Sequence, residues 1–233
     1  MRNRKDTTVQ FRPRRRTDTK LIPTLLIGAL GIVGIVALFL LVPGVQFIEL
    51  VLLAIVVGIV AMGYRQGIIR GIISILFLYI ATGIAATFYP IPAPYVSGIR
   101  DMFAGNLVGG RLDVANVNVD GDSLGVSFIL LMLVVWIVLE AIGHRASPDT
   151  SLPRLGILDN LAGAGVHLVI GVLVASLLFN AIGYGHLRRA HHKAVFRSRF
   201  NQVLTLHYGA QSFWFGESPP PIYVYDLDVP VER

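Results

Sequence analysis

The sequence contains no cysteine and few charged residues. Without cysteine, a disulfide framework, a thiol nucleophile and a cysteine-ligated zinc site are excluded. Charged residues make up 15% of the 233 residues, against about 25% in average soluble proteins, so a disordered chain and an ordinary soluble enzyme are excluded. A nucleophile elbow, a His-Glu-x-x-His motif, a phosphate-binding loop and a dinucleotide fingerprint are also missing. We therefore expect no catalytic residues, no metal site and no enzyme activity.

Long apolar runs dominate the remaining composition. Hydrophobic residues make up 54% of the chain, and the mean hydropathy is +0.67. About 20 apolar residues in a helix cross a bilayer, and only helices and closed barrels satisfy the backbone there. The runs are too long for the alternating pattern of a barrel. The predicted fold class is an all-α polytopic membrane helix bundle of about five transmembrane helices, at 21–42, 45–64, 68–89, 124–143 and 157–184.

The chain divides into four parts, over residues 1–20, 21–42, 45–184 and 185–233. The first part is basic and polar, so we expect it to be disordered. The second is an additional transmembrane anchor, because it is longer than the apolar core of a signal peptide and no cleavage motif follows it. The third is a four-helix membrane domain that includes a Gly/Asn/Asp-rich loop over 90–123. The fourth is a basic amphipathic segment with an extended tail.

The distribution of Lys and Arg predicts the orientation. Short basic loops stay in the cytoplasm, and with a cytoplasmic N-terminus the inner segments carry more Lys and Arg than the outer ones. The basic tail then lies outside against this rule, although a tail of roughly 50 residues can translocate despite its charge. We therefore expect the N-terminus to be cytoplasmic and the C-terminus to be outside.

Four ionisable residues fall near the inner ends of the expected spans. Such groups cost about 3 kcal/mol at membrane depth on insertion scales, so they usually face the bundle and find a partner. We expect Asp159 to pair with Arg70 or Arg65, with a proton or ion relay as the alternative. Glu49, near the opposite face, is expected to snorkel to the interface. The predicted structural ion-pair residues are Arg65, Arg70, Glu140 and Asp159.

Glycines recur four residues apart around the second connection, and eight apart in the last span. Residues at this spacing share one helix face, and small side chains let helices approach closely in lipid. We interpret the pattern as static helix packing, with a flexible or gated interface as the alternative. The predicted packing glycines are Gly63, Gly67, Gly71, Gly163 and Gly171.

His167 lies between Gly163 and Gly171 on one face of the last span. The preferred interpretation is a histidine that is hydrogen-bonded to a neighbouring helix. Glycine leaves room for a flat ring, so a tetrapyrrole or a partner contact at His167 is the alternative. We therefore expect no cofactor, with a tetrapyrrole as the less favoured possibility.

Residues 186–207 have the pattern of a basic amphipathic helix, with apolar residues that include Phe196 and Phe200. Such helices lie in the headgroup plane, and the aromatic run 213–215 is typical of an interfacial anchor. Docking on a partner is the alternative. The expected partners are membrane lipids and other membrane proteins, and not nucleic acid, because basic runs beside apolar spans suit anionic lipid.

Three stretches resemble the CvpA family, the colicin V production proteins. They are the glycine/arginine connection at 63–71, the Leu-Pro-Arg-Leu-Gly-Ile-Leu-Asp segment at 152–159 with the glycines after it, and the Phe-Arg-Ser-Arg-Phe segment at 196–200. The resemblance implies a four-helix inner-membrane protein of bacteria with no known catalytic residues, linked to colicin V secretion and envelope homeostasis. A similar unit precedes a periplasmic protease in some relatives, which supports an outside C-terminus.

The chain departs from the family pattern in three ways. It has an extra N-terminal helix, it has His167 where the family usually has glycine, and its tail carries no protease. The first hypothesis is a non-enzymatic CvpA-like protein that serves envelope maintenance or secretion through helix packing and partner docking. The second is an accessory subunit of a larger photosynthetic or respiratory membrane complex. A small channel or transporter is the third, disfavoured because no polar track crosses the spans.

Overall fold

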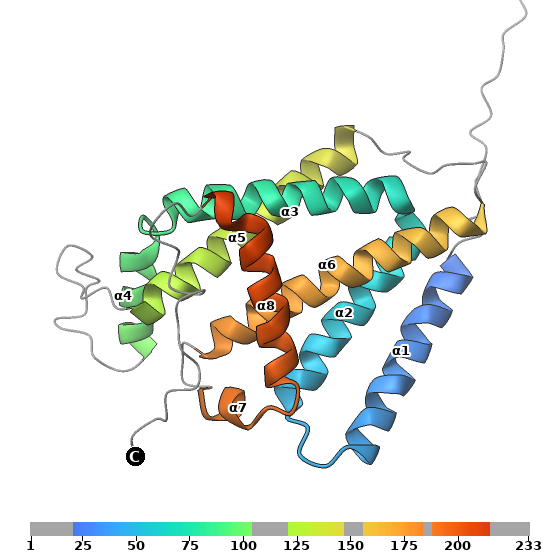
Figure 1. The fold of residues 1–233 in the computed structure, drawn as a ribbon, viewed down its shortest axis with the longest axis horizontal. Helices are drawn as coiled ribbons and strands as arrows, with labels where there is room; N and C mark the ends of the chain where they lie inside the picture. The colour runs from blue at the N-terminus through green and yellow to red at the C-terminus, as the bar shows by residue number, and fades with distance from the viewer. Residues whose placement is uncertain (1–20, 104–120, 147–155, 184–187, 215–233) are drawn as a thin grey trace, which may run out of the picture.

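A computed structural model describes residues 21–103, 121–146, 156–183 and 188–214, which are helical for most of their length (Figure 1). No strand occurs within these ranges. Five helices are long and apolar enough to cross a membrane, which confirms the all-α polytopic bundle. They are α1 (Leu21–Leu41), α2 (Phe47–Gln66), α3 (Ile68–Phe88), α5 (Gly121–Ala146) and α6 (Ile157–Gly183). The expected disorder at 1–20 and the extended tail after residue 214 lie outside the described residues.

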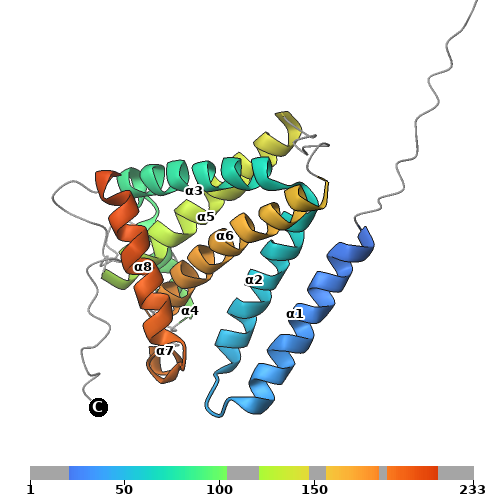
Figure 2. The ribbon, with the colours of Figure 1, turned by 45° about the vertical axis from the view of Figure 1, so that its right-hand side comes forward.

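The first two helices form an antiparallel hairpin. Gly44 in the connection has φ +91°, a conformation that glycine adopts at no steric cost. Helix α1 packs along α2 at the edge of the bundle (Figure 2). None of its residues is buried, so α1 presents a long apolar surface to its surroundings.

A single residue joins α2 to α3. Helix α2 continues to Gln66 and α3 begins at Ile68, so the connection predicted over 64–67 shrinks to Gly67. Gly67 has φ +84°, in the left-handed region that side chains disfavour. The chain therefore turns sharply, and α3 leaves in a new direction across the bundle (Figure 1).

Helix α6 is the central element of the bundle. It packs along α2 and α3, while α5 packs mainly on α3. One apolar cluster lies between α3, α5 and α6 and includes Leu78, Phe128 and Leu177. A second lies between α2 and α6 and includes Leu52 and Phe179. Both clusters are completed by side chains from the segment after α6.

Part of the segment predicted as a loop is helical. Helix α4 (Ala93–Phe103) begins inside the proline-rich stretch after α3. Pro94 falls in its first turn, where the missing N–H would have no partner in any case. The hydroxyls of Ser97 and Ser123 lie 3.0 Å apart and connect α4 to the start of α5.

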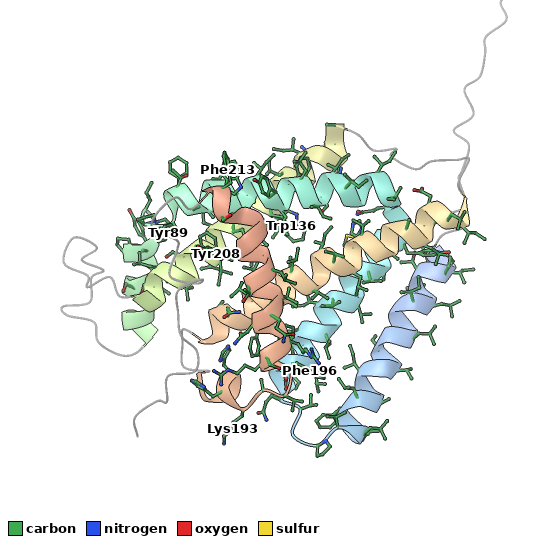
Figure 3. All side chains as sticks on the ribbon, viewed as in Figure 1. Tyr89, Trp136, Lys193, Phe196, Tyr208 and Phe213 are labelled. Atoms are coloured by element: carbon green, nitrogen blue, oxygen red, sulfur yellow. The ribbon has the colours of Figure 1, made fainter. Side chains whose placement is uncertain are left out.

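The predicted amphipathic segment forms two helices, α7 (Arg188–Lys193) and α8 (Arg197–Gln211), followed by a 3-10 turn at Ser212–Trp214. The apolar side of α8 packs on the protein's own bundle. Phe200 is buried and its ring stacks on that of Phe179 in α6, with ring centroids 4.8 Å apart. Figure 3 shows Phe196 at the start of α8 and Phe213 beyond its end. The headgroup-plane prediction missed this docking, because apolar residues four apart suit a protein surface as well as a lipid surface.

Candidate functional site

Most of the predicted site residues converge where α6 crosses the corner between α2 and α3. Close backbone contact and buried polar side chains occur together at this place. We call it the glycine crossing, defined by Gly63, Gly67, Gly71, Gly163, Asp159 and His167.

Gly163 marks the closest approach of the two backbones. A Cβ atom on Gly163 would lie 2.6 Å from the carbonyl oxygen of Gly63 and 2.7 Å from Cα of Gly67. Eight residues further along α6, a Cβ on Gly171 would lie 3.2 Å from Cα of Val56. The glycines of α6 therefore let its backbone rest directly on α2.

Gly63 and Gly71 make room for side chains from α6. A Cβ atom on Gly63 would overlap the His167 side chain, reaching 2.6 Å from its Nδ1. A Cβ atom on Gly71 would lie 2.7 Å from Cγ1 of Val166. The glycine series on both sides of the corner faces α6, although Gly67 itself belongs to the connection and not to a helix.

Asp159 links the first turn of α6 to the start of α3. Its Oδ1 accepts a hydrogen bond from the backbone N–H of Ile68 at 3.0 Å, and the residue is 1% exposed. A Cβ on Gly67 would lie 2.5 Å from Oδ2, so glycine is needed here for space as well as for its backbone conformation. The carboxylate thus caps the N-terminus of α3, where a negative charge suits the helix dipole.

Arg70 pairs with Glu140 of α5, and not with Asp159 as one of the predicted pairings had it. Its Nη2 contacts the Glu140 carboxylate and also donates to the Glu140 carbonyl oxygen at 2.8 Å. The N–H of Ile68 is one of the free donors at the start of α3 and points out of the helix end toward Asp159, whereas the Arg70 side chain projects sideways from α3 toward α5. Arg65 is exposed at the end of α2. Glu140 therefore has the role in binding Arg70 that the sequence analysis assigned to Asp159.

A glycine in α5 makes space for the buried guanidinium. A Cβ on Gly143 would lie 2.6 Å from Cε2 of Phe77 and 3.0 Å from Nη1 of Arg70. Arg70 is 1% exposed. Burial of this kind is tolerated because the opposite charge of Glu140 lies beside it.

The snorkelling prediction for Glu49 is wrong. Glu49 is fully buried, and its Oε2 accepts the backbone N–H of Gln46 at 2.7 Å. Its Oε1 accepts the backbone N–H of Phe196, also at 2.7 Å. One carboxylate therefore serves the N-termini of both α2 and α8. The Gln-x-x-Glu spacing at residues 46–49 is a capping-box signal that would have identified the first contact.

His167 is 4% exposed and hydrogen-bonded on both sides of its ring. Its Nδ1 lies 2.9 Å from the carbonyl oxygen of Gly163, and its Nε2 lies 3.1 Å from Oε1 of Gln66. Nε2 of Gln66 in turn lies 3.1 Å from Nε2 of His144. Both ring nitrogens of His167 thus have hydrogen-bond neighbours within the protein, as the preferred interpretation expected. Gln66 and His144 were missed by the sequence analysis, because polar residues at a span's end look like ordinary solvent-facing positions.

Two other buried hydroxyls bond within their own helices. Thr82 donates to the carbonyl oxygen of Leu78 at 2.9 Å, and Ser176 donates to that of Val172 at 2.7 Å. Among the described residues, three or more His, Asp or Glu side chains do not gather into a group able to hold a metal ion. Within the described bundle, polar side-chain contacts between helices occur at the two carboxylate caps, at the Arg70–Glu140 pair, between Ser97 and Ser123, and at the glycine crossing.

The family model described as Colicin V production protein matches residues 48–207. The match begins at the start of α2 and ends near the end of α8, so α1 lies outside it. Comparison with curated proteins and with solved structures gives no significant match.

Proposed function

Because the chain belongs to the colicin V production protein family, we propose that it is a non-enzymatic scaffold for secretion and envelope maintenance in the bacterial cytoplasmic membrane. Its five long apolar helices make it a multi-pass membrane protein. The proposal rests on how its buried charged groups are used. Asp159 caps α3, Glu49 caps α2 and α8, and Arg70 binds Glu140.

Ionisable side chains at membrane depth are by default candidates for transport or catalysis. Here each of these groups makes a contact between elements that are distant in sequence. Ile68 and Asp159 are 91 positions apart, and Glu49 and Phe196 are 147 apart. The groups therefore hold the bundle in one arrangement, which suits a protein that acts by presenting a surface.

Helix α1 supplies the partner surface in this proposal. It packs along α2, has no buried residue and lies outside the family match. Apolar side chains such as Leu30, which is 70% exposed, point away from the bundle. The occupant that we propose is a transmembrane helix of another envelope protein.

Measuring the export of colicin V from cells tests the proposed scaffold function. In a bacterial host without its own family member, we expect this chain to restore export. A photo-crosslinking residue at Leu30 should capture a distinct membrane protein, whereas the same residue at Leu52, which is 2% exposed, should not. Failure to restore export, or crosslinks at Leu30 to lipid alone, would overturn the proposal.

The proposed orientation has a cytoplasmic N-terminus and an outside C-terminus. The chain has no native cysteine, so single cysteines report their side of the membrane without background. Lys193 in α7 and Arg145 at the end of α5 are both exposed. A membrane-impermeant maleimide added to intact spheroplasts should label Lys193→Cys and leave Arg145→Cys unlabelled. The opposite pattern would invert the topology.

A further inference from the structure

A row of polar side chains leads from the end of α5 into the glycine crossing. It begins at His144, which is exposed, and passes to Gln66 at the end of α2. It continues to His167 in α6 and ends at the carbonyl oxygen of Gly163. Three helices each contribute one side chain, and the contacts are 3.1, 3.1 and 2.9 Å long.

Both ring nitrogens of His167 face oxygen atoms. A neutral imidazole has one donor and one acceptor, whereas an imidazolium has two donors. Two oxygen neighbours therefore match a protonated His167. A neutral ring that donates from Nδ1 to Gly163 needs a donor at Nε2, and Gln66 provides one when its amide group is turned over.

The orientation of the Gln66 amide also determines the state of His144. With its oxygen toward His167, the amide donates from its NH2 group to Nε2 of His144, which must then carry no hydrogen. With the amide turned over, its oxygen faces His144 and Nε2 of His144 must carry hydrogen. We propose that His144 and His167 share one proton through the Gln66 amide, so that protonation of one histidine opposes protonation of the other.

Each element that packs near His167 carries a charged group. Arg70 of α3 and Glu140 of α5 act on the ring with opposite sign and are paired with each other. Asp159 lies two turns earlier in α6, and Arg65 is exposed at the end of α2. Arg70 and Glu140 are engaged with each other, and the Gln66 amide is the group that contacts both histidines.

The shared proton links the aqueous face at the end of α5 to the contact between α2 and α6. Gly63 lies against the ring of His167, so a charge on that ring appears directly at the closest helix packing. The pair thus makes the crossing responsive to pH. This inference does not depend on the scaffold function or on its partner.

Nitrogen NMR of the full chain in lipid nanodiscs tests the coupling. The chain has six histidines, whose ¹⁵N ring signals can be assigned by single substitutions and followed over about pH 4–9. Loss of one charge-assisted hydrogen bond should weaken binding of the second proton roughly 10- to 100-fold. Gln66→Met should make the two histidines titrate independently. Gln202→Met, at an exposed position of α8, is the matched control and should leave the coupling unchanged.

Two outcomes overturn the proposal. The first is an identical His144 titration in the wild type and in Gln66→Met. The second needs no variant and is read from the wild type alone. In the step in which His167 gains its proton, the His144 tautomer should change from Nε2–H to Nδ1–H. A His144 ring that keeps one tautomer throughout would contradict the shared proton.

Discussion

Replacing Gly163 with alanine tests the glycine crossing most directly. The new Cβ atom would lie 2.6 Å from the Gly63 carbonyl oxygen, and ordinary contacts of such an atom begin at 3.4 Å. The neighbouring atoms belong to the backbone of the α2–α3 corner, so no side-chain rotation relieves the overlap. The two backbones must separate, and the Asp159 cap on Ile68 moves with them.

The expected cost follows from overpacking. Overpacked substitutions typically destabilise by about 1–3 kcal/mol, and the backbone contact favours the upper part of that range. Alanine also gains about 1 kcal/mol in helix propensity over glycine, which would hide part of the effect. Gly165→Ala has the same gain, and its Cβ would meet nothing within 4 Å. The comparison between Gly163→Ala and Gly165→Ala therefore isolates the steric cost.

Reversible unfolding in mixed detergent micelles measures this difference. The chain has two tryptophans, Trp136 in α5 and Trp214 after α8, whose fluorescence reports the bundle. We expect Gly165→Ala to match or exceed the wild type in free energy of unfolding, and Gly163→Ala to fall below it by about 1–3 kcal/mol. Equal stability of the two variants would refute the close backbone contact at Gly163.

Three further substitutions test the buried polar groups. Glu49→Gln removes the negative charge of the carboxylate that accepts two backbone N–H groups. Amide hydrogen exchange should therefore accelerate at the start of α8 and stay unchanged in α3. Unchanged exchange at Phe196 would contradict the cap. Arg70→Met leaves Glu140 unpaired and should cost about 3–5 kcal/mol of unfolding free energy, most of it recovered in the double variant with Glu140→Met; equal stabilities of the single and double variants would refute the pair. Burial lowers the pKa of His207 from 6.5 to about 4. The contribution of the neutral His207 ring to the free energy of unfolding is therefore complete above pH 6.5 and is lost as the pH falls toward 4. The total loss is on the order of 3 kcal/mol. His207→Asn should show a shallower loss of stability over that interval, and an unchanged pH profile would contradict the burial of a neutral ring.

The sequence predicted which residues share the glycine crossing better than it predicted their pairing. The four-residue spacing predicted that Gly63, Gly67 and Gly71 lie at a close helix contact, and the structure shows that α6 is the element they contact. Asp159 was predicted to pair with Arg70 or Arg65 because all three lie near the inner ends of their spans, whereas Arg70 pairs with Glu140. Depth along the membrane normal follows from position in a run, whereas the direction a side chain faces depends on how its helix is rotated. That rotation is decided by packing with other helices.

The membrane location, the number of spans and the presence of small-residue faces were determined by the sequence alone. Hydropathy is a sum over neighbouring residues, and an apolar segment in lipid forms a helix because its backbone hydrogen bonds must be made within the protein. Tertiary structure alone decided that Glu49 reaches the segment after α6, that α8 packs on the bundle, and that Gln66 lies between two histidines. The hydrogen bonds among these contacts join residues that are 78 to 147 positions apart. No local pattern encodes them, because they form only when the helices have crossed at particular angles.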